Sequence, residues 1–238
     1  MITSDRERVH REVVSFVRRS ARMRPNQREA WDRLHDRFVV EVPRLQTSTS
    51  VAPAATLDLT AVFGRDAPLV VEVGPGTGDS LVPMAWALPT ANILAFEVYQ
   101  PAIAQILAAL ERDAVENVRI LEADAVAGLE HVVPTGVIDD LWTFFPDPWH
   151  KLRHHKRRLV TPAFASLAAS RLAPGAVWRL ATDWSGYAEQ MVEVLDAVPL
   201  LTGGVVPRWS ERPVTKFERK GLAAGRVITD LRYLAVPS

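Results

Sequence analysis

The sequence predicts an α/β protein with a Rossmann-like, doubly wound and mostly parallel seven-stranded sheet, helices on both faces and an antiparallel C-terminal strand pair. Two observations carry this prediction. From Pro68 onward, short and nearly continuous apolar runs alternate with stretches of helical periodicity, as in a parallel sheet whose strands are buried on both faces. A glycine-rich turn follows the first run, which is typical of the turns that bind ligands in such sheets.

Length and composition agree with a globular protein. The chain has 238 residues, of which 48% are apolar and 24% are charged, so bulk disorder is excluded. The absence of cysteine excludes a disulfide scaffold and a thiolate metal site. The chain has no apolar run long enough for a membrane helix, and its first residues are charged, unlike a signal peptide. We therefore expect a cytoplasmic protein. The 28 basic and 28 acidic residues cancel, so nucleic-acid binding would need local clusters of charge.

The first part of the chain, residues 1–57, is expected to form an arginine-rich arm, a helix and a linker before the main domain at 58–238. Residues 1–25 contain seven arginines and few large apolar side chains. Asn26 as an N-cap, followed by apolar residues at helical spacing, predicts a helix to about Val40. The small, polar and proline-bearing stretch 46–57 predicts a linker.

The main domain is predicted to alternate strands and helices. Apolar runs too short for helices predict five strands, at 69–73, 93–98, 118–121, 137–145 and 176–181. Amphipathic stretches between them predict helices at 80–88, 101–112, 162–171 and 187–195. The helix at 162–171 ends before the stop signal Ala173-Pro174-Gly175. Segments 200–206 and 226–235 have strand composition and no predicted helix between them, so they would form the antiparallel pair.

The glycine-rich turn carries the first sign of a ligand. It lies in Glu72-Val73-Gly74-Pro75-Gly76-Thr77-Gly78, where glycines let the backbone approach a ligand closely. A dinucleotide-binding loop would have a third glycine at position 79, where this chain has Asp79. The pattern instead resembles the loop of S-adenosylmethionine-dependent methyltransferases, whose cofactor carries no phosphate. The alternative is a tight turn without a ligand.

Acidic residues also end the next two strands. Glu97 closes the second strand, where a carboxylate can accept hydrogen bonds from both hydroxyls of a ribose, unless it is only a solvated strand end. Asp124 follows the third strand and could hold an adenine amino group or cap a helix. Three successive strands that each end in an acid favour a binding site.

The fourth strand leads to a proline-flanked aspartate and a basic run. Two prolines enclose Asp147 and fix the backbone around its carboxylate, as in many methyltransferases that act on nitrogen. The next eight residues, 151–158, include five permanent positive charges. Because this run adjoins the candidate site, we interpret it as a surface for a polyanionic substrate rather than as a solvated face. Asp183 ends the fifth strand, and the loop at 212–218 is predicted from its residues alone to be a hairpin connection without a role.

Together these motifs resemble the bacterial tRNA (guanine-N7-)-methyltransferase family, over most of the chain. The most specific are Pro146-Asp147-Pro148-Trp149 with its basic tail and Thr215-Lys216-Phe217-Glu218; residues 15–19 with Arg22, the glycine loop and Thr182-Asp183 agree. The resemblance implies methyl transfer from S-adenosyl-L-methionine to N7 of the guanosine at position 46 in the variable loop of tRNA. It implies tRNA as the partner, no obligatory protein partner, and a monomer or homodimer.

The resemblance also implies roles for single residues. Asp147 would be the catalytic residue. The cofactor would be bound by Glu72, Gly74, Gly76, Gly78, Glu97, Asp124 and Asp147. The target guanosine would be held by Lys151, Asp183, Thr215, Lys216, Phe217 and Glu218. The RNA would be contacted by Arg153, His154, His155, Lys156, Arg157 and Arg158. Two positions depart from the family pattern: Lys220 stands where arginine is expected, and Arg226 where many members have histidine. Both residues keep or add positive charge.

Two other functions stay open at this point. A methyltransferase of the same fold that acts on a small molecule or a protein would leave the basic run unexplained. A non-catalytic RNA-binding protein could retain the cofactor pocket without transferring a methyl group. A nicotinamide oxidoreductase is disfavoured by Asp79. No metal site is predicted, because the histidines have neither carboxylate spacing nor cysteine partners.

Overall fold

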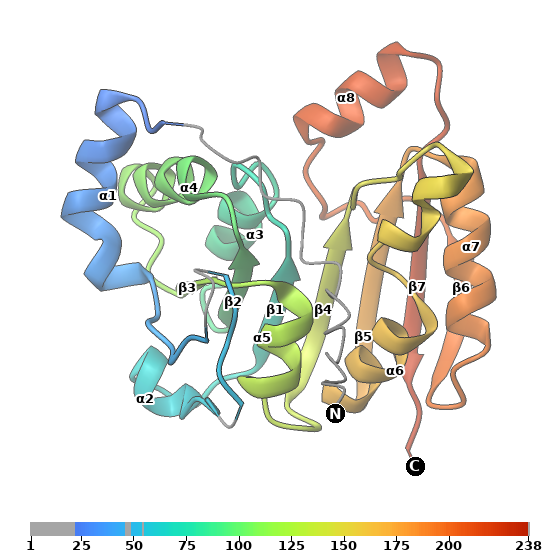
Figure 1. Cartoon of the computed structure of the whole chain (residues 1–238), viewed down its shortest axis with the longest axis horizontal. Helices are drawn as coiled ribbons and strands as arrows, with labels where there is room; N and C mark the ends of the chain where they lie inside the picture. The colour runs from blue at the N-terminus through green and yellow to red at the C-terminus, as the bar shows by residue number, and fades with distance from the viewer. Residues whose placement is uncertain (1–21, 46–48, 54, 238) are drawn as a thin grey trace, which may run out of the picture.

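A seven-stranded sheet forms the centre of the protein. A computed structural model describes residues 22–45, 49–53 and 55–237, so most of the predicted arm lies outside the described residues. Across the sheet the strands follow the order β3-β2-β1-β4-β5-β7-β6 (Figure 1). Their bounds are β1 Leu69–Val73, β2 Asn92–Glu97, β3 Val118–Glu122, β4 Ile138–Phe144, β5 Leu172–Thr182, β6 Leu201–Val206 and β7 Thr229–Ala235.

The sheet is mostly parallel. β1 pairs in parallel with β2 and β4, β2 with β3, and β4 with β5. β7 runs antiparallel to both β5 and β6. The strand order reverses between β1 and β4, which is the switch point where doubly wound sheets bind ligands. The predicted fold class is therefore confirmed.

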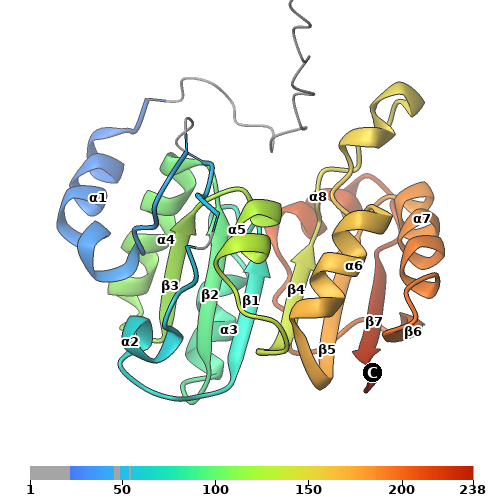
Figure 2. The same cartoon turned by 60° about the horizontal axis from the view of Figure 1, so that its bottom comes forward.

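Helices cover both faces of this sheet. They are α1 Pro25–Phe38, α2 Leu59–Phe63, α3 Leu81–Ala87, α4 Gln100–Arg112, α5 Ala125–His131, α6 Pro162–Arg171, α7 Ser185–Asp196 and α8 Lys216–Ala223, with a 3₁₀ helix at Leu152–Arg157. Val71 shares a buried cluster with residues of α5, α6 and α7, and its neighbour Val70 shares another with residues of α1, α3 and α4. Figure 2 shows α5 and α6 in front of the strands. No helix in the described part of the chain is long and apolar enough to cross a membrane.

Several predicted boundaries differ from the observed ones for local reasons. α1 begins at Pro25, whose fixed φ suits the first helical position, so Arg24 and not Asn26 is the N-cap. The stop signal Ala173-Pro174-Gly175 already lies inside β5, which follows α6 without a loop. Asp124 caps α5, a helix that the sequence patterns do not predict.

The prediction that no helix lies between the last two strands is wrong. α8 occupies part of this segment and lies beyond the carboxyl end of β4 in Figure 1. Thr215 is its N-cap, and the hydroxyl accepts a hydrogen bond from the amide of Glu218 at 3.2 Å. The predicted hairpin connection is therefore the entry to a helix.

The described part of the predicted linker packs against the main domain. Val51 is only 1% exposed, and the Thr49 carbonyl accepts a hydrogen bond from the Asp124 amide at 2.9 Å. α1 lies against α4. The division at residue 57 stays a prediction.

Candidate active site

The carboxyl ends of the parallel strands surround an open cleft of about 2050 Å³. Its lining brings together predicted residues from five separate segments, namely Glu72 with Gly74 and Gly76, Glu97, Asp124, Asp147 and Asp183, whereas Gly78 does not line it. Thr215 and Phe217 of the α8 entry line the same cleft, with Lys156 and Arg157 of the basic run. A smaller hollow of about 770 Å³, beside Arg65 and Asn92, contains none of the predicted site residues.

The glycine loop has a backbone that other residues rarely adopt. Gly74, Gly76 and Gly78 have φ angles of 69°, 58° and 81°, in the left-handed region that favours glycine. A Cβ atom on Gly78 would also lie 3.0 Å from the Ile106 side chain of α4. The loop therefore needs glycine both for its conformation and for its close packing on α4.

Glu97 organises this loop through its carboxylate. One oxygen accepts hydrogen bonds from the amides of Val98 at 2.7 Å and Tyr99 at 2.9 Å, and the other accepts one from the amide of Gly76 at 3.0 Å. Burial raises the pKa of Glu97, although these three amides oppose the rise. Glu97 thus joins the end of β2 to the glycine loop.

Glu72 has a buried carboxylate with one oxygen unused. The side chain is 1% exposed, and its Oε1 accepts a hydrogen bond from Ser80 Oγ at 2.7 Å. Its Oε2 has no hydrogen-bond partner among the described residues, and burial raises the pKa of Glu72 to about 7. A buried acceptor without a partner is costly. Its position at the glycine loop therefore fits a ligand with a cationic or N–H donor group.

The raised pKa of Glu72 predicts pH-dependent stability without cofactor. The pKa of this carboxyl group is about 7 in the folded protein and 4.5 ordinarily. Between these pH values the folded protein binds more protons than the unfolded chain, so the free energy of unfolding falls as the pH rises. Glu72→Gln removes this loss. The free energy of unfolding of Glu72→Gln, measured relative to the parent, should therefore rise by about 2 kcal/mol between pH 5 and pH 8.

Urea unfolding at the two pH values measures the difference. Glu130→Gln, which alters an exposed glutamate of α5, is the control and should follow the parent. If Glu72→Gln also follows the parent at both pH values, the carboxyl group does not titrate in this range.

Asp124 is a helix cap in this structure. Its carboxylate accepts hydrogen bonds from the amides of Val126 at 2.9 Å and Ala127 at 3.3 Å. The cap alternative is thus confirmed. Asp124 also lines the cleft, and its contact with an adenine stays a prediction.

The segment around Asp147 is held in a strained conformation. Phe145 and Trp149, on either side of Pro146-Asp147-Pro148, have φ angles of 52° and 44°, which non-glycine residues rarely adopt. The Phe145 amide donates to the Ala181 carbonyl at 2.7 Å, and Arg158 Nε donates to the Pro148 carbonyl at 2.8 Å. Asp147 itself is exposed at the cleft.

Arg158 differs from the rest of the basic run. We expected it to contact RNA, but its side chain is buried, and the residue is 3% exposed. It donates hydrogen bonds to Gln190 Oε1 at 2.6 Å and to the Gly186 carbonyl at 3.1 Å, and its guanidinium lies 4.7 Å from the Tyr187 ring centre. The expectation that the run lies wholly at the surface is therefore wrong at this position. Lys151, Arg153, Lys156 and Arg157 are exposed, and His154 and His155 are half-buried.

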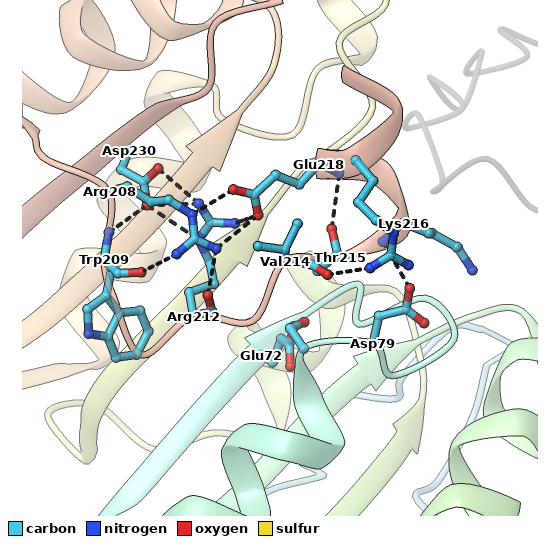
Figure 3. A network of polar contacts seen from close by, with 12 residues as sticks. Glu72, Asp79, Arg208, Trp209, Arg212, Val214, Thr215, Lys216, Glu218 and Asp230 are labelled. Atoms are coloured by element: carbon cyan, nitrogen blue, oxygen red, sulfur yellow. Dashed lines mark hydrogen bonds and ion pairs between the residues drawn. The ribbon is translucent and has the colours of Figure 1, made fainter. Parts of the chain in front are cut away.

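The predicted guanosine-binding residues lie in different surroundings. Phe217 is 53% exposed and Lys151 is exposed, but Lys151 does not line the cleft. Asp183 is half-buried and paired with Arg226. Glu218 is buried, and its carboxylate is bound by Arg208 and Arg212 rather than turned to the cleft (Figure 3). Its contact with a guanosine stays a prediction.

The residues that bind Glu218 have no role that sequence reasoning assigns. Arg212 is 1% exposed, and it donates to Glu218 Oε2 at 2.6 Å and to Asp230 Oδ2 at 2.9 Å. Its guanidinium lies 5.2 Å from the ring centre of Phe145, which precedes the Asp147 segment. The only signal in the sequence is an arginine six residues before Glu218, and nothing there shows that both are buried.

No group of three or more His, Asp or Glu side chains that could hold a metal ion occurs among the described residues. The ionisable groups that line the cleft combine carboxylates at the strand ends with cations at the rim. This mixture suits an organic ligand that carries both donors and acceptors of hydrogen bonds.

Comparison with protein families gives a consistent match. The family model described as "Putative methyltransferase" matches residues 66–231. The tRNA (guanine-N(7)-)-methyltransferase of Cutibacterium acnes is 54% identical over 236 residues, which cover 97% of this chain and 86% of that protein. The enzyme of the same name from Methylococcus capsulatus is 46% identical, with 94% of each chain covered.

Solved structures share the fold at low sequence identity. The 16S rRNA methyltransferase KamB is 16% identical with a TM-score of 0.55, covering 76% of this chain and 93% of that chain. A 16S rRNA (adenine(1408)-N(1))-methyltransferase from Catenulisporales acidiphilia, solved with its cosubstrate SAM, is 18% identical with a TM-score of 0.52, covering 82% and 96%. Both support the Rossmann-like fold.

Proposed function

Because the chain belongs to the tRNA (guanine-N(7)-)-methyltransferase family, we propose that it methylates N7 of the guanosine at position 46 in the variable loop of tRNA, with S-adenosyl-L-methionine as the methyl donor. The observation that carries this proposal is the cleft itself. Glu72 with Gly74 and Gly76, Asp147 and the α8 entry meet in it, and Lys156 and Arg157 of the exposed basic run lie at its rim. The substrate implies that the protein works in the cytoplasm.

The cofactor fits the carboxylates of the cleft. Glu72 offers an unused buried oxygen to a cationic group, and the methionyl part of S-adenosylmethionine carries one. Glu97 lies at the end of β2, where it would accept hydrogen bonds from the ribose hydroxyls. Asp124 would lie nearest the adenine. Glu72, at the glycine loop, would repel a pyrophosphate bound at that loop, which favours a cofactor without phosphate.

The chemistry asks little of the protein beyond positioning. When bound, the cofactor supplies an electrophilic methyl group on a sulfonium. N7 of guanine carries a lone pair and no proton, so no general base has to act, and holding N7 in line with the methyl group lowers the barrier. The ring gains positive charge during the transfer. Carboxylates at the cleft, Asp147 and Asp183, would stabilise that charge.

The exposed part of the basic run should bind tRNA phosphates. Replacing Arg153, Lys156 and Arg157 together by alanine should weaken tRNA binding and lower the slope of log affinity against log salt by about 2, because each lost phosphate contact removes about 0.7. Cofactor affinity should be unchanged. Arg158 is left intact, because it is buried against Pro148 and Gln190.

Filter binding at several salt concentrations gives the slope. Arg112→Ala is the control, because Arg112 is exposed at the far end of α4, away from the cleft. If the triple variant folds and keeps the parent's slope, the run is only a solvated face, and a small-molecule or protein substrate becomes the better proposal.

Methylation of tRNA tests the proposal directly. The protein is incubated with labelled S-adenosylmethionine and an unmodified tRNA transcript, and the RNA is then cleaved chemically at N7-methylguanosine. We expect one cleavage site, in the variable loop, and none in a transcript with adenosine at that position. Cofactor binding without label in the RNA would instead indicate a non-catalytic RNA-binding protein or another substrate.

A further inference from the structure

Asp79 occupies the place where a dinucleotide-binding loop would have glycine, and it has its own set of contacts. Its Oδ1 accepts a hydrogen bond from Thr77 Oγ1 at 2.9 Å, within the glycine loop. Its Oδ2 accepts one from the backbone amide of Lys216 at 3.1 Å, across 137 positions of sequence. Figure 3 shows Asp79 beside Lys216 at the start of α8. This carboxylate therefore joins the glycine loop to the first turn of α8.

Lys216 closes the connection from its side chain. Its ammonium donates a hydrogen bond to Thr77 Oγ1, so Asp79, Thr77 and Lys216 form a closed ring of three hydrogen bonds. Asp79 is also a negative charge at the N-terminus of α8, where the helix dipole favours it. We call these three residues the loop–helix latch.

The opposite side of the same turn is fixed separately. Glu218, two residues after Lys216, is bound by Arg208 and Arg212, and Arg212 is bound in turn by Asp230 of β7. Between the two anchors, the exposed Phe217 ring lies close to Gly76, since a Cβ atom there would be 3.9 Å from it. The turn is therefore held over the glycine loop from both sides.

We propose that Asp79 is a positioning residue: the loop–helix latch holds the turn from Thr215 to Phe217 in the orientation that binds the acceptor base. This inference rests on the proposed function and on the guanosine-binding role that the family resemblance implies for Thr215, Lys216 and Phe217. Asp79 would act through the Lys216 amide and not by contact with the cofactor. Its loss should therefore weaken tRNA binding and leave cofactor affinity unchanged.

Two substitutions at Lys216 separate the contribution of its backbone N–H from that of its side chain. Lys216 is the first residue of α8, where proline is favoured, and Thr215 has φ −75° and ψ 166°, which a residue before proline prefers. Lys216→Ala and Lys216→Pro both remove the ammonium group, but only proline removes the N–H that Asp79 accepts. Both variants are compared in the parent and in Asp79→Ala, as a double-mutant cycle.

The readouts are dissociation constants for an unmodified tRNA transcript and for S-adenosylhomocysteine. With Asp79 present, Lys216→Pro should bind tRNA about tenfold more weakly than Lys216→Ala, the size expected for a hydrogen bond to a charged group. With Asp79→Ala the two should agree within a factor of two. Asp79→Asn, which keeps one acceptor oxygen but not the charge, should give a tRNA affinity between those of the parent and Asp79→Ala. S-adenosylhomocysteine should bind equally in all variants, and Asp66→Ala, at an exposed aspartate before β1, should match the parent.

Two results of the binding measurements would overturn the proposal. One is equal tRNA affinity for the proline and alanine variants when Asp79 is present. The other is weaker S-adenosylhomocysteine binding by Asp79→Ala with normal tRNA binding, which would make Asp79 a cofactor ligand. The rate of hydrogen exchange at the Lys216 amide tests the latch without any substrate. Because Asp79 accepts a hydrogen bond from this amide, Asp79→Ala should raise the exchange rate at least tenfold. A parent protein that does not methylate tRNA would end the proposed function, whereas unchanged exchange would end the latch.

Discussion

Asp147→Ala is expected to lower turnover about a hundredfold while the affinities for cofactor and tRNA change little. Removing a preorganised group that stabilises charge at a reacting centre typically has an effect of this size. The segment around Asp147 has two strained residues, Phe145 and Trp149, and is fixed by Arg158 through the Pro148 carbonyl. Because the backbone is held independently of the carboxylate, the substitution should remove the charge and leave the loop in place.

Single-turnover methylation with saturating tRNA measures this effect apart from binding. Asp147→Asn keeps the shape and one acceptor oxygen but not the charge, so its rate should lie between those of the parent and the alanine variant. A rate equal to the parent's in both variants would make Asp147 an ordinary turn residue, and Asp183 would then be the carboxylate to test next.

The parallel part of the fold could be predicted because its signal is local. All five residues of β1 and all six of β2 are buried, so these strands stand out in the sequence as nearly continuous apolar runs. The same logic places the carboxylates, because residues at the ends of parallel strands meet at one edge of the sheet. The chain order of Glu72, Glu97 and Asp147 was therefore enough to assign them to one cleft.

α8 could not be predicted because buried ion pairs, rather than an apolar face, hold the helix in place. Only two residues of the helix are buried, Glu218 and Gly221. The Glu218 side chain is bound by Arg208 and Arg212. The large apolar side chains of α8, Phe217 and Leu222, are both exposed, so no buried apolar stripe supports the helix. Tertiary ion pairs take the place of the hydrophobic face.

Arg158 shows the same limit at a single position. The five lysines and arginines among residues 151–158 look alike in the sequence, and which of them turns inward depends on the acceptors nearby. Here those acceptors are the Pro148 and Gly186 carbonyls and Gln190, which reach the site from α7 and from the Asp147 segment. Only the folded chain brings them together.

Arg212→Ala should have the largest effect on stability. The guanidinium is fully buried between the carboxylates of Glu218 and Asp230 and lies 5.5 Å from the ring centre of Phe144. Burial alone would raise the pKa of Glu218, but Arg208 and Arg212 outweigh it and lower that pKa. Removing Arg212 leaves buried carboxylates without their main cation, which costs about 3–5 kcal/mol in free energy of unfolding. Urea unfolding measures this loss.

Two further variants separate stability from function. Arg208→Ala removes a cation whose side chain is 35% exposed, so it should cost about 1 kcal/mol or less, because solvent screens such pairs. Arg212→Met combined with Glu218→Gln and Asp230→Asn removes the buried charges together, and should regain much of the stability lost by Arg212→Ala. It should not regain tRNA methylation, because the turn from Thr215 to Phe217 would lack its anchor on β7. If Arg212→Ala unfolds within about 1 kcal/mol of the parent, the network does not stabilise the fold; if the triple variant is fully active, the anchor does not position the turn.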